Sequence, residues 1–451
     1  MRPALSVEAP WPLAGSAEFE LVSPDWRAQT AERLRDGLQR HVIEPWFPRS
    51  IDRLGGGFLC DFDRRWRPSG KQDRMLEFQA RQTRAAARLG LAFPADVRWP
   101  EIALHGFTYL REVMHDSSDG GFFGKVDSSG QPLDDGSKHA HGTAYAIAAG
   151  VELYRLTGSV DGLDMAREAF AWLERTCHDG IHGGYHGWTT RDGRLILSAA
   201  DVREPAAKDP LGHGIGLKDA NVNSDLMDAF ALLVVEWPDP MLRTRLLELH
   251  EIVTGRFVTQ GGSMHYLLYP DLSAVPGIER FGYPLQTAAR LPLIAPVVGR
   301  SVAEGLASAR RILDHVIEWG WDGNRGGFVE AGPSAEPTIL SGVSLRLPGR
   351  PWWVQSEAVI LLALLAVAEP GVVLYRDRLG SLLDVIENEL TDARYGGWYA
   401  IARGDWSRWT RLSGRGIRKG DVWKDASHET DMYLTAIRIL RGLHPRAPIE
   451  T

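Results

Sequence analysis

Six Gly-Gly pairs, spaced almost evenly along 451 residues, constrain the fold of this chain more than any other feature. The pairs begin at Gly56, Gly120, Gly183, Gly261, Gly326 and Gly396. Successive pairs are 63 to 78 residues apart, an aromatic residue directly follows five of the six, and Asp or Asn precedes most of them. Glycine permits positive φ, and Asp or Asn bonds to the local backbone, so these are turn sequences. Their regular recurrence indicates a repeat architecture of six units.

One stretch of helical periodicity precedes each Gly-Gly pair, and another follows it. Before the pairs we predict helices over residues 25–43, 98–115, 161–177, 239–258, 302–320 and 371–390. After the pairs we predict helices over residues 75–90, 139–156, 221–236, 284–298, 353–368 and 428–441. The first set is amphipathic and charged, as expected of helices with one face in solvent, whereas the second set is rich in Ala and Gly with few charges, as expected of a crowded inner layer.

Twelve helices in six pairs fit an all-α fold, either an open solenoid or a closed (α/α)6 barrel. Solenoid repeats are mostly shorter, about 33 to 47 residues, and lack a long glycine loop inside each unit. We therefore predict a single (α/α)6 barrel over residues 25–445, with the Gly-Gly-aromatic loops and short hairpins at its mouth, and an N-terminal extension over residues 1–24. A single barrel accounts for a length that otherwise suggests two or three domains.

Composition excludes several classes of protein. With 51 Lys and Arg against 58 Asp and Glu, the net charge is −7 and no basic stripe is present, so we expect no nucleic-acid partner. The two cysteines, Cys60 and Cys177, can form neither a disulfide framework nor a thiolate metal centre. No signal-peptide pattern is visible, and the longest apolar run, over residues 359–368, is half a membrane span. We expect a cytoplasmic protein without a membrane partner, either a monomer or a homodimer.

Polar residues at the starts of the second set of helices are the candidates for chemistry, because those helix ends and the loops before them line the mouth of such a barrel. Arg81 is unusual in an inner helix, and its guanidinium suits either the binding of hydroxyl groups and a developing oxyanion or a structural ion pair. His139 and His141 open the next inner helix. Two residues apart, they should point to different helix faces, so we expect no two-histidine metal site.

The third inner helix carries a polar stripe where an apolar face is expected. Asn221, Asp225 and Asp228 are spaced i, i+4 and i+7 and therefore share one helix face. A role in capping the helix would explain why polar residues such as Asp219 and Asn221 stand at its start. Capping does not explain a polar residue as far along the helix as Asp228.

The fourth and fifth inner helices begin with aromatic and polar residues. Tyr283 and Gln286 open the fourth helix, and Trp353, Gln355 and Glu357 open the fifth. Because Trp353 and Glu357 are at i and i+4, an indole face lies beside a carboxylate, an arrangement common where a sugar ring stacks and its hydroxyls are held.

Trp423 and His428 lead into the sixth inner helix. Among 14 histidines, His428 is the best acid and base candidate, since it lies at a helix entrance on the presumed pocket side; the alternative is a capping or core histidine. The sequence contains no nucleophile elbow of the serine hydrolases, no phosphate-binding P-loop and no HExxH metalloprotease motif.

At these residues the sequence resembles the N-acylglucosamine 2-epimerase superfamily, which includes cellobiose 2-epimerases, mannose 2-epimerases and aldose–ketose isomerases. The matching motifs span nearly the whole chain and lie at residues 55–58, 79–81, 218–221, 352–357, 395–399 and 423–428. The resemblance implies an (α/α)6 barrel that acts on free sugars without a metal or nicotinamide cofactor. It also implies removal of the C2 proton by one histidine, an enediolate intermediate, and reprotonation aided by a second histidine.

Matched residue by residue, the resemblance assigns His428 as one of those histidines and Arg81 as the arginine of a Gln-Ala-Arg motif. It assigns Trp353, Glu357 and Trp423 to the set that holds the sugar. With the residues singled out above, the predicted catalytic set is His428, Arg81, Tyr283, Asp225 and Glu357. The predicted substrate-binding set is Trp353, Trp423, Asn221, Asp228, Gln286, His141 and Gln355. No metal ligands and no cofactor are predicted.

Three positions depart from the family pattern. The family motif Asn-x-His-x-His-x-x-Glu reads Asn221 to Asp228 here, so Asp225 stands where an active-site histidine belongs. The motif Gly-His-x-x-Glu reads 282–286 here, so Tyr283 replaces the second catalytic histidine and Gln286 replaces its carboxylate neighbour. A tyrosine with a pKa near ~10 needs a shift of about 3 units, roughly 4 kcal/mol, to act as a base at neutral pH. Tyr283 is therefore better suited to donate a proton or a hydrogen bond.

These departures leave three hypotheses. The leading one is a sugar isomerase or epimerase that moves a proton between C1 and C2 with His428 as its main acid and base. A second is a glycoside hydrolase, or another enzyme that cleaves a C–O bond, with Asp225 or Glu357 in a carboxylate pair. A third is a catalytically silent sugar-binding protein that keeps Trp353 and Trp423 as stacking platforms. Fold alone does not decide among them.

Overall fold

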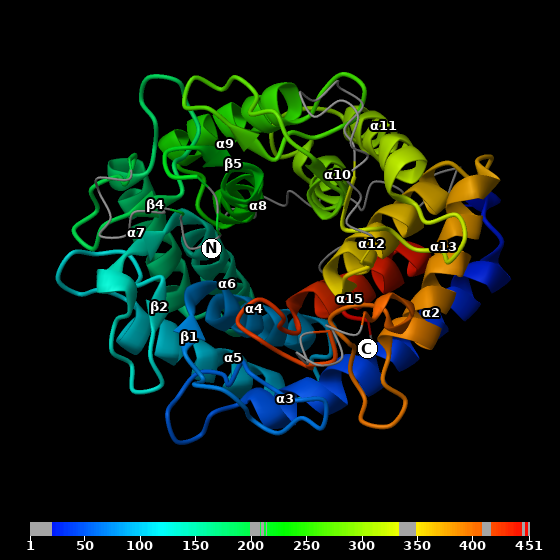
Figure 1. Cartoon of the computed structure of the whole chain (residues 1–451), viewed down its shortest axis with the longest axis horizontal. Coiled ribbons are helices and arrows are strands. Elements are labelled where there is room, and N and C mark those ends of the chain that lie inside the picture. The colour runs from blue at the N-terminus through cyan, green and yellow to red at the C-terminus, as the bar shows by residue number, and fades with distance from the viewer. Residues whose placement is uncertain are drawn as a thin grey trace, which may run out of the picture.

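Two concentric rings of helices make up the molecule (Figure 1). The computed structural model describes residues 20–198, 208, 212, 214–332, 349–407, 416–443 and 447–449. Within these ranges the inner ring consists of α4 (Leu76–Ala92), α6 (Ala140–Thr157), α8 (Ala220–Glu236), α10 (Gly282–Ile294), α12 (Trp352–Ala368) and α15 (Ser427–Arg441). The outer ring consists of α2 (Pro24–Leu38), α5 (Arg98–Tyr109), α7 (Val160–Thr176), α9 (Pro240–Ile252), α11 (Val302–Gly320) and α13 (Val373–Val385), with the short α3 (Glu44–Ser50) beyond α2.

Local sequence signals fix where these helices begin and end. Asp239 caps α9, which has proline at its first position, and Ser301 caps α11 in a reciprocal capping box with Glu304. Helix α15 ends at Gly442 in the left-handed conformation. Four outer helices continue into a π-helical turn, over Gln39–Ile43, Leu110–Met114, Val253–Phe257 and Ile386–Leu390. The predicted helix bounds therefore agree with the structure to within a few residues.

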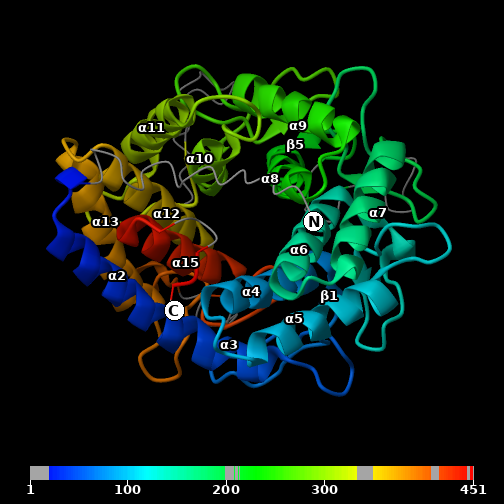
Figure 2. The same cartoon turned by 180° about the vertical axis from the view of Figure 1, so that it is seen from behind.

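The ring closes between the two ends of the chain. Helix α15 packs against α12 on one side and against α4 and α2 on the other (Figures 1 and 2). The remaining inner helices contact one another in chain order, from α4 to α6, α8, α10 and α12. The predicted all-α (α/α)6 barrel is therefore confirmed. Most of the predicted extension over residues 1–24 lies outside the described residues, and its boundary stays a prediction.

Backbone hydrogen bonds close each Gly-Gly loop, and five of the six loops share one pattern. In the first loop the Asp52 amide donates to the Gly57 carbonyl and the Gly56 amide donates to the Asp52 carbonyl, both at 3.0 Å. The same pattern joins Asp116 to residues 120–121, Asp179 to 183–184, Asp322 to 326–327 and Asp392 to 396–397, while the fourth loop uses Thr259. Gly57 has a φ of +62°, and a Cβ there would lie 2.5 Å from Gln79 Oε1. The close approach of the inner helix is therefore a second reason for glycine.

Buried amide side chains of the inner helices hold these loops. Gln79 accepts from the Phe58 amide and donates to the Phe58 carbonyl, each at 2.8 Å. Gln355 does the same with Phe328, at 2.8 and 2.7 Å. Asn223 holds Tyr185 in the same way, at 3.0 and 3.3 Å. Because both ends of its amide are bonded to backbone, Gln355 is a structural residue, and its prediction as a substrate ligand is corrected.

Short antiparallel strand pairs tie the start of an inner helix to the following unit. They pair β1 (Arg74–Met75) with β2 (Lys125–Val126), β3 (Lys138–His139) with β4 (Trp188–Thr189), β5 (Lys218–Asp219) with β6 (Leu267–Leu268), and β7 (Glu279–Arg280) with β8 (Ala331–Gly332). Isolated bridges such as Val126 to Pro132 fold the outgoing segments into the predicted short hairpins. The strand register places residues such as His139 directly before an inner helix.

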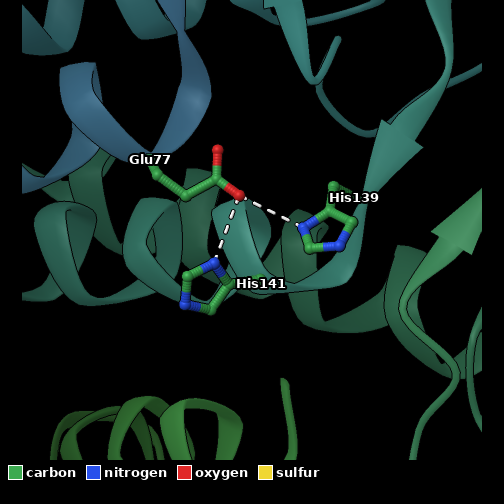
Figure 3. Close-up of side chains that lie close together, drawn as sticks. All are labelled: Glu77, His139 and His141. Atoms are coloured by element: carbon green, nitrogen blue, oxygen red, sulfur yellow. Dashed lines mark hydrogen bonds and ion pairs between the residues drawn. The ribbon is translucent and has the colours of Figure 1, made fainter. Parts of the chain in front are cut away.

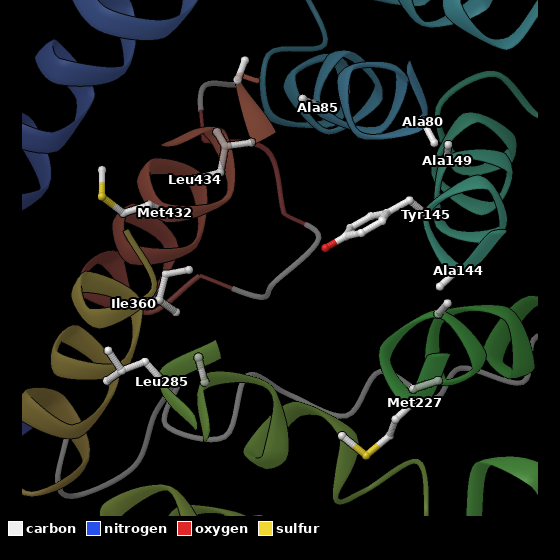
Figure 4. Close-up of a cluster of buried hydrophobic side chains, with 14 of the residues drawn as sticks. Ala80, Ala85, Ala144, Tyr145, Ala149, Met227, Leu285, Ile360, Met432 and Leu434 are labelled. Atoms are coloured by element: carbon white, nitrogen blue, oxygen red, sulfur yellow. The ribbon is translucent and has the colours of Figure 1, made fainter. Parts of the chain in front are cut away.

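The buried core contains side chains from all six inner helices. The small residues Ala80 and Ala149 allow α4 and α6 to approach closely (Figure 4). In the same view, the ring of Tyr145 extends from α6 toward the middle of the barrel. Across the described residues, none of the helices combines the length and the apolar character needed to cross a bilayer.

Replacement of Gln355 by Leu tests the structural role of this amide. The variant leaves the buried amide and carbonyl of Phe328 without their partner, so we expect the free energy of unfolding to fall by about 2 to 4 kcal/mol. Equilibrium denaturation in urea measures the change. The matched control is Gln39→Leu, which removes an exposed contact to Glu44 and should change stability by less than about 0.5 kcal/mol. Unchanged stability with weakened ligand binding would restore Gln355 to the binding site.

Candidate active site

A cavity of about 470 Å³ lies where the inner helices begin. Its described lining consists of Arg81, His141, Tyr145, Gly212, Asn221, Tyr266, Arg280, Tyr283, Gln286, Glu330, Trp352, Trp353, Trp423 and His428. The volume falls within the range of small-molecule sites, and six of the fourteen lining residues are Trp or Tyr. The cavity therefore combines flat aromatic faces with a few hydrogen-bonding and ionisable groups.

His428 is held by a carboxylate. It lies in the first turn of α15, and its Nδ1 is 2.7 Å from Oε1 of Glu357 on α12. Since a carboxylate accepts, the Nδ1–H donates to it, and Nε2 remains as the ring nitrogen available to a ligand. The ring lies 5.9 Å from the Trp353 ring, centre to centre. This arrangement gives His428 a fixed tautomer suited to proton transfer.

Arg81 forms the structural ion pair that was one of its two predicted alternatives. Its Nε donates to Asp425 Oδ2 at 2.6 Å, and its Nη2 donates to the Trp423 carbonyl at 2.9 Å. The guanidinium carbon lies 5.2 Å from the centre of the Tyr145 ring. Burial would lower the pKa of Arg81, but the Asp425 charge holds that pKa above its ordinary value. Arg81 is thus a structural ion pair that still presents N–H groups to the cavity.

Asp225 is a saturated, ionised carboxylate behind the cavity wall. It accepts from His141 Nε2 and from the Tyr145 hydroxyl, each at 2.9 Å, and from Arg290. Burial would raise its pKa, but the Arg290 charge and the His141 hydrogen bond hold that pKa far below its ordinary value. A carboxylate so held cannot act as a general acid near neutral pH. The structure therefore weighs against Asp225 as half of a glycosidase pair.

His139 and His141 converge on one carboxylate oxygen (Figure 3). The Nδ1 atoms of His139 and His141 are 3.1 and 3.3 Å from Oε1 of Glu77, so the prediction that they point apart was wrong. The helix-face argument fails because His139 belongs to strand β3 and only His141 is helical. Burial would raise the pKa of Glu77, but the hydrogen bonds from both histidines lower it.

His141 is held as an imidazolium. Burial opposes the charge, but the hydrogen bonds to Asp225 and Glu77 raise the pKa of His141 to about 9. The potential ligand atoms of Glu77, His139 and His141 lie within 4.8 Å of one another, as they would around a metal ion. A doubly protonated His141 has no lone pair to offer, so metal binding at this cluster would require loss of a proton from His141. The predicted absence of metal ligands stays a prediction.

Tyr283 is part of an aromatic wall. Its hydroxyl accepts from Asn221 Nδ2 at 3.3 Å and lies 3.3 Å from the Tyr266 hydroxyl. The rings of Tyr283 and Tyr266 are stacked 4.6 Å apart, and Trp353 lies 5.1 Å from Tyr283. Loss of hydration is the main cause that raises the pKa of Tyr283. The phenol is therefore protonated at neutral pH and carries a hydrogen that it can donate.

Eight of the twelve predicted site residues line the cavity. They are Arg81, His141, Asn221, Tyr283, Gln286, Trp353, Trp423 and His428. Asp225 and Glu357 lie behind the lining, each bonded to a lining histidine. Asp228 does not reach the cavity; its carboxylate is 3.6 Å from Arg84 and 3.8 Å from Arg290. The stripe that starts at Asn221 runs down α8, and seven residues carry Asp228 about 10 Å from the mouth, so its prediction as a substrate ligand is corrected.

Several lining residues escaped the sequence analysis. Tyr145 is one turn after His141 on the same helix face, a signal that could have been used. Tyr266, Arg280 and Glu330 belong to the strands and loops before and after α10. No periodic pattern marks such residues, because the pairing of distant strands places them at the cavity.

The fold and this cavity define an (α/α)6-barrel protein with an aromatic site equipped for acid and base chemistry. The sequence model of the N-acylglucosamine 2-epimerase (GlcNAc 2-epimerase) family matches residues 56–197 and 289–413, more than half of the chain. The chain belongs to this family. The unmatched stretch between the two matches contains Asp225, Tyr283 and Gln286, where the sequence departs from the family motifs.

Relatives and solved structures agree with this assignment. The cellobiose 2-epimerase of Bacteroides fragilis is 24% identical over 426 residues, covering 89% of this chain and 97% of the relative. A cellobiose 2-epimerase of Ruminococcus albus is 23% identical over 386 residues, covering 81% of this chain and 89% of the relative. The structure of cellobiose 2-epimerase from Spirochaeta thermophila superimposes with a TM-score of 0.79 at 20% identity, covering 93% of this chain and 98% of the other.

Two further solved structures share the barrel. A D-mannose isomerase superimposes with a TM-score of 0.74 at 18% identity, covering 94% of this chain and 98% of the other. A family 76 glycoside hydrolase superimposes with a lower TM-score of 0.57 at 12% identity, covering 93% of this chain and 78% of the other. At such identities the structural likenesses establish the fold. The sugar epimerase and isomerase class predicted from the sequence is confirmed at the level of the family.

The charge on His141 predicts a pH dependence of stability. An unfolded histidine has a pKa near ~6.5, and the folded pKa is raised to about 9, so the bound proton stabilises the fold fully below about pH 6.5. This stabilisation, on the order of 3 kcal/mol, is lost as pH rises through about 9. Urea denaturation between pH 6 and 10 should show the decline in the wild type, and His141→Gln should flatten it. The exposed His182 provides the control variant His182→Gln. If stability declined with pH as steeply in His141→Gln as in the wild type, the charged state of His141 would be refuted.

Proposed function

We propose that this protein is a sugar isomerase or epimerase that transfers a proton at C1 and C2 of an open-chain sugar, with His428 as its principal acid and base. The observation that carries the proposal is the 2.7 Å contact between His428 Nδ1 and Glu357 Oε1 at an aromatic cavity. Relatives that are cellobiose 2-epimerases along nearly the whole chain support the same reaction class.

The first step removes a proton from carbon. His428 Nε2 takes the C2 proton of the aldehyde form, the C–H electron pair forms the C1–C2 double bond, and negative charge moves to the carbonyl oxygen at C1. Glu357 stabilises the imidazolium that results, because its carboxylate accepts from Nδ1–H. Arg81 presents N–H groups to the cavity and is suited to stabilise the enediolate oxygen.

The second step returns a proton to one of the two carbons. Return by His428 to C1, with transfer of the O2 proton to O1, gives a ketose and needs a single base. Return to the opposite face of C2 gives the epimer and needs a second acid. Tyr283 occupies the motif position of that second acid, and its protonated phenol can donate. We favour the one-base isomerisation, because a phenol exchanges its proton less readily than an imidazole at neutral pH.

The other two hypotheses have less support. A glycoside hydrolase needs one protonated carboxyl group, but Asp225 is ionised among three donors and Glu357 is engaged by His428. A silent binding protein has no need for a buried carboxylate that orients the cavity histidine. The likeness to the glycoside hydrolase is one of fold.

The cellular setting belongs to the same proposal. We infer a cytoplasmic monomer or homodimer whose partner is a small carbohydrate rather than a nucleic acid. The buried, unpaired thiols of Cys60 and Cys177 suit a reducing compartment. His428 carries the proton transfer, Arg81 stabilises the enediolate oxygen and Tyr283 is the candidate second acid, with no metal and no cofactor.

Deuterium exchange tests the assignment of the base. Chelator-treated protein is incubated in D2O with mannose, glucose and cellobiose, and NMR follows deuterium at C1 and C2. We expect exchange with the wild type and a loss of about 10²- to 10⁴-fold in His428→Ala. The exposed His182 provides the control His182→Ala, which should keep its activity. Undiminished exchange in His428→Ala would remove His428 as the base, and new reducing ends without exchange would favour hydrolysis.

Replacement of Tyr283 by Phe tests the second acid. The variant keeps the stacking on Tyr266 but loses the hydroxyl that contacts Asn221. We expect formation of the C2 epimer to fall about 10²-fold, because the second proton donor is lost, while exchange and ketose formation by His428 continue. The ratio of exchange to epimer formation, measured by NMR and chromatography, should therefore rise. An unchanged rate of epimer formation would exclude Tyr283 from proton donation.

A further inference from the structure

Some charged side chains on the cavity wall have close ion-pair partners, and others do not. The ionisable lining residues other than tyrosine are Arg81, His141, Arg280, His428 and Glu330, so Glu330 is the one carboxylate in the described lining. Buried carboxylates behind the wall neutralise Arg81 and the imidazolium of His141, and Glu357 holds His428. Among the basic side chains of the described lining, Arg280 is the only one whose charge has no close ion-pair partner.

Arg280 is positioned by its neighbours but makes no hydrogen bond to the described residues. Its guanidinium carbon lies 5.3 Å from the centre of the Tyr266 ring, which fixes its direction at the cavity. Nη1 is 3.7 Å from Glu330 Oε1, beyond hydrogen-bond distance, and the two side chains are 39% and 36% exposed. Such exposed pairs are weak. The planar fork of N–H donors is therefore available to an anionic group of a ligand.

A continuous row of rings joins Arg280 to the catalytic histidine. Arg280 lies over Tyr266, Tyr266 stacks on Tyr283 at 4.6 Å, Tyr283 lies 5.1 Å from Trp353, and Trp353 lies 5.9 Å from His428. A sugar that lies along these rings with its C1 and C2 at His428 directs its other end toward Arg280. One end of the row therefore holds the base, and the other end holds a cation with free donors.

A second feature favours the same kind of ligand. Gln286 lines the cavity at the motif position where the family pattern has a glutamate. The amide keeps the shape and the hydrogen-bonding capacity of that side chain but removes its negative charge. Position 286 carries no negative charge to repel an anionic ligand, and Arg280 carries a positive charge that attracts one. The cavity therefore favours the binding of an anionic ligand.

We propose that the substrate is an acidic sugar, whose carboxylate, sulfonate or phosphate group at the end remote from C1 and C2 binds to Arg280. This inference rests on the proposed function, since it places the reacting carbons at His428. The anionic group accepts hydrogen bonds from the Arg280 guanidinium and displaces Glu330 from its neighbourhood. Arg280 is thus a specificity-determining residue, and the reaction chemistry stays with His428.

Matched pairs of acidic and neutral sugars test the proposal. Deuterium exchange is measured with mannuronate and mannose 6-phosphate against mannose, and with glucuronate against glucose. We expect KM to be at least about 10-fold lower for an acidic member of a pair, and to rise with ionic strength for that member alone. In Arg280→Gln the ratio of KM for the neutral sugar to KM for the acidic sugar should fall by about 10- to 100-fold, as expected for the loss of hydrogen bonds to a charged group.

A comparable arginine on the outer ring provides the control. Arg300 lies 3.6 Å from Glu304 at the start of α11, an exposed pair like that of Arg280 and Glu330. Arg300→Gln should leave both KM values unchanged. Equal KM values for acidic and neutral sugars in the wild type, or an unchanged preference in Arg280→Gln, would overturn the assignment of Arg280 while the exchange itself still supports the proposed function.

Binding measurements separate the two proposals. If no sugar exchanges deuterium, the proposed function fails, and isothermal titration calorimetry with the same sugars still tests Arg280. Tighter binding of the acidic sugars, lost in Arg280→Gln, supports the anion site. Binding without preference for the acidic sugars overturns it.

Discussion

Hydrogen bonds from the inner helices to the backbone of the Gly-Gly loops are the interactions on which the rest of this structure depends. A tight glycine loop exposes amide and carbonyl groups that cannot be buried unpaired, and the inner ring supplies their partners. Gln79, Asn223 and Gln355 each bond both backbone groups of the aromatic residue that ends a loop. These contacts fix the start of an inner helix relative to its loop, and the cavity lies where those starts converge.

Buried charge has two different uses at this site. Around Asp225, the donors His141, Tyr145 and Arg290 leave the carboxylate fully satisfied, so the cluster is a rigid support for the wall rather than a source of protons. Among the described residues, Glu357 has one donor partner, His428, whose second nitrogen is left for a ligand. The same chemical group thus closes a structural cluster in one place and orients a cavity histidine in another, according to how many donors surround it.

The helices and the main site residues were predictable from the sequence because their signals are local. Helical periodicity, caps such as Ser301 with Glu304, and glycine turns lie within a few residues of one another. Arg81, Tyr283, Trp353 and His428 were found because they lie at helix starts. The direction of His139 and the loop-holding role of Gln355 were not predicted, since each depends on a partner far away in the chain.

The repeated glycine loops and the two helices in each unit are enough to determine a ring of six pairs, because each unit must bury its apolar faces against its neighbours. Which polar groups meet inside that ring was decided only by its closure. His141 and Asp225 are 84 residues apart in sequence, His428 and Glu357 are 71 apart, and Arg81 and Asp425 are 344 apart. No local pattern encodes such pairs, because closure of the ring, and not sequence neighbourhood, brings their helices side by side (Figures 1 and 2).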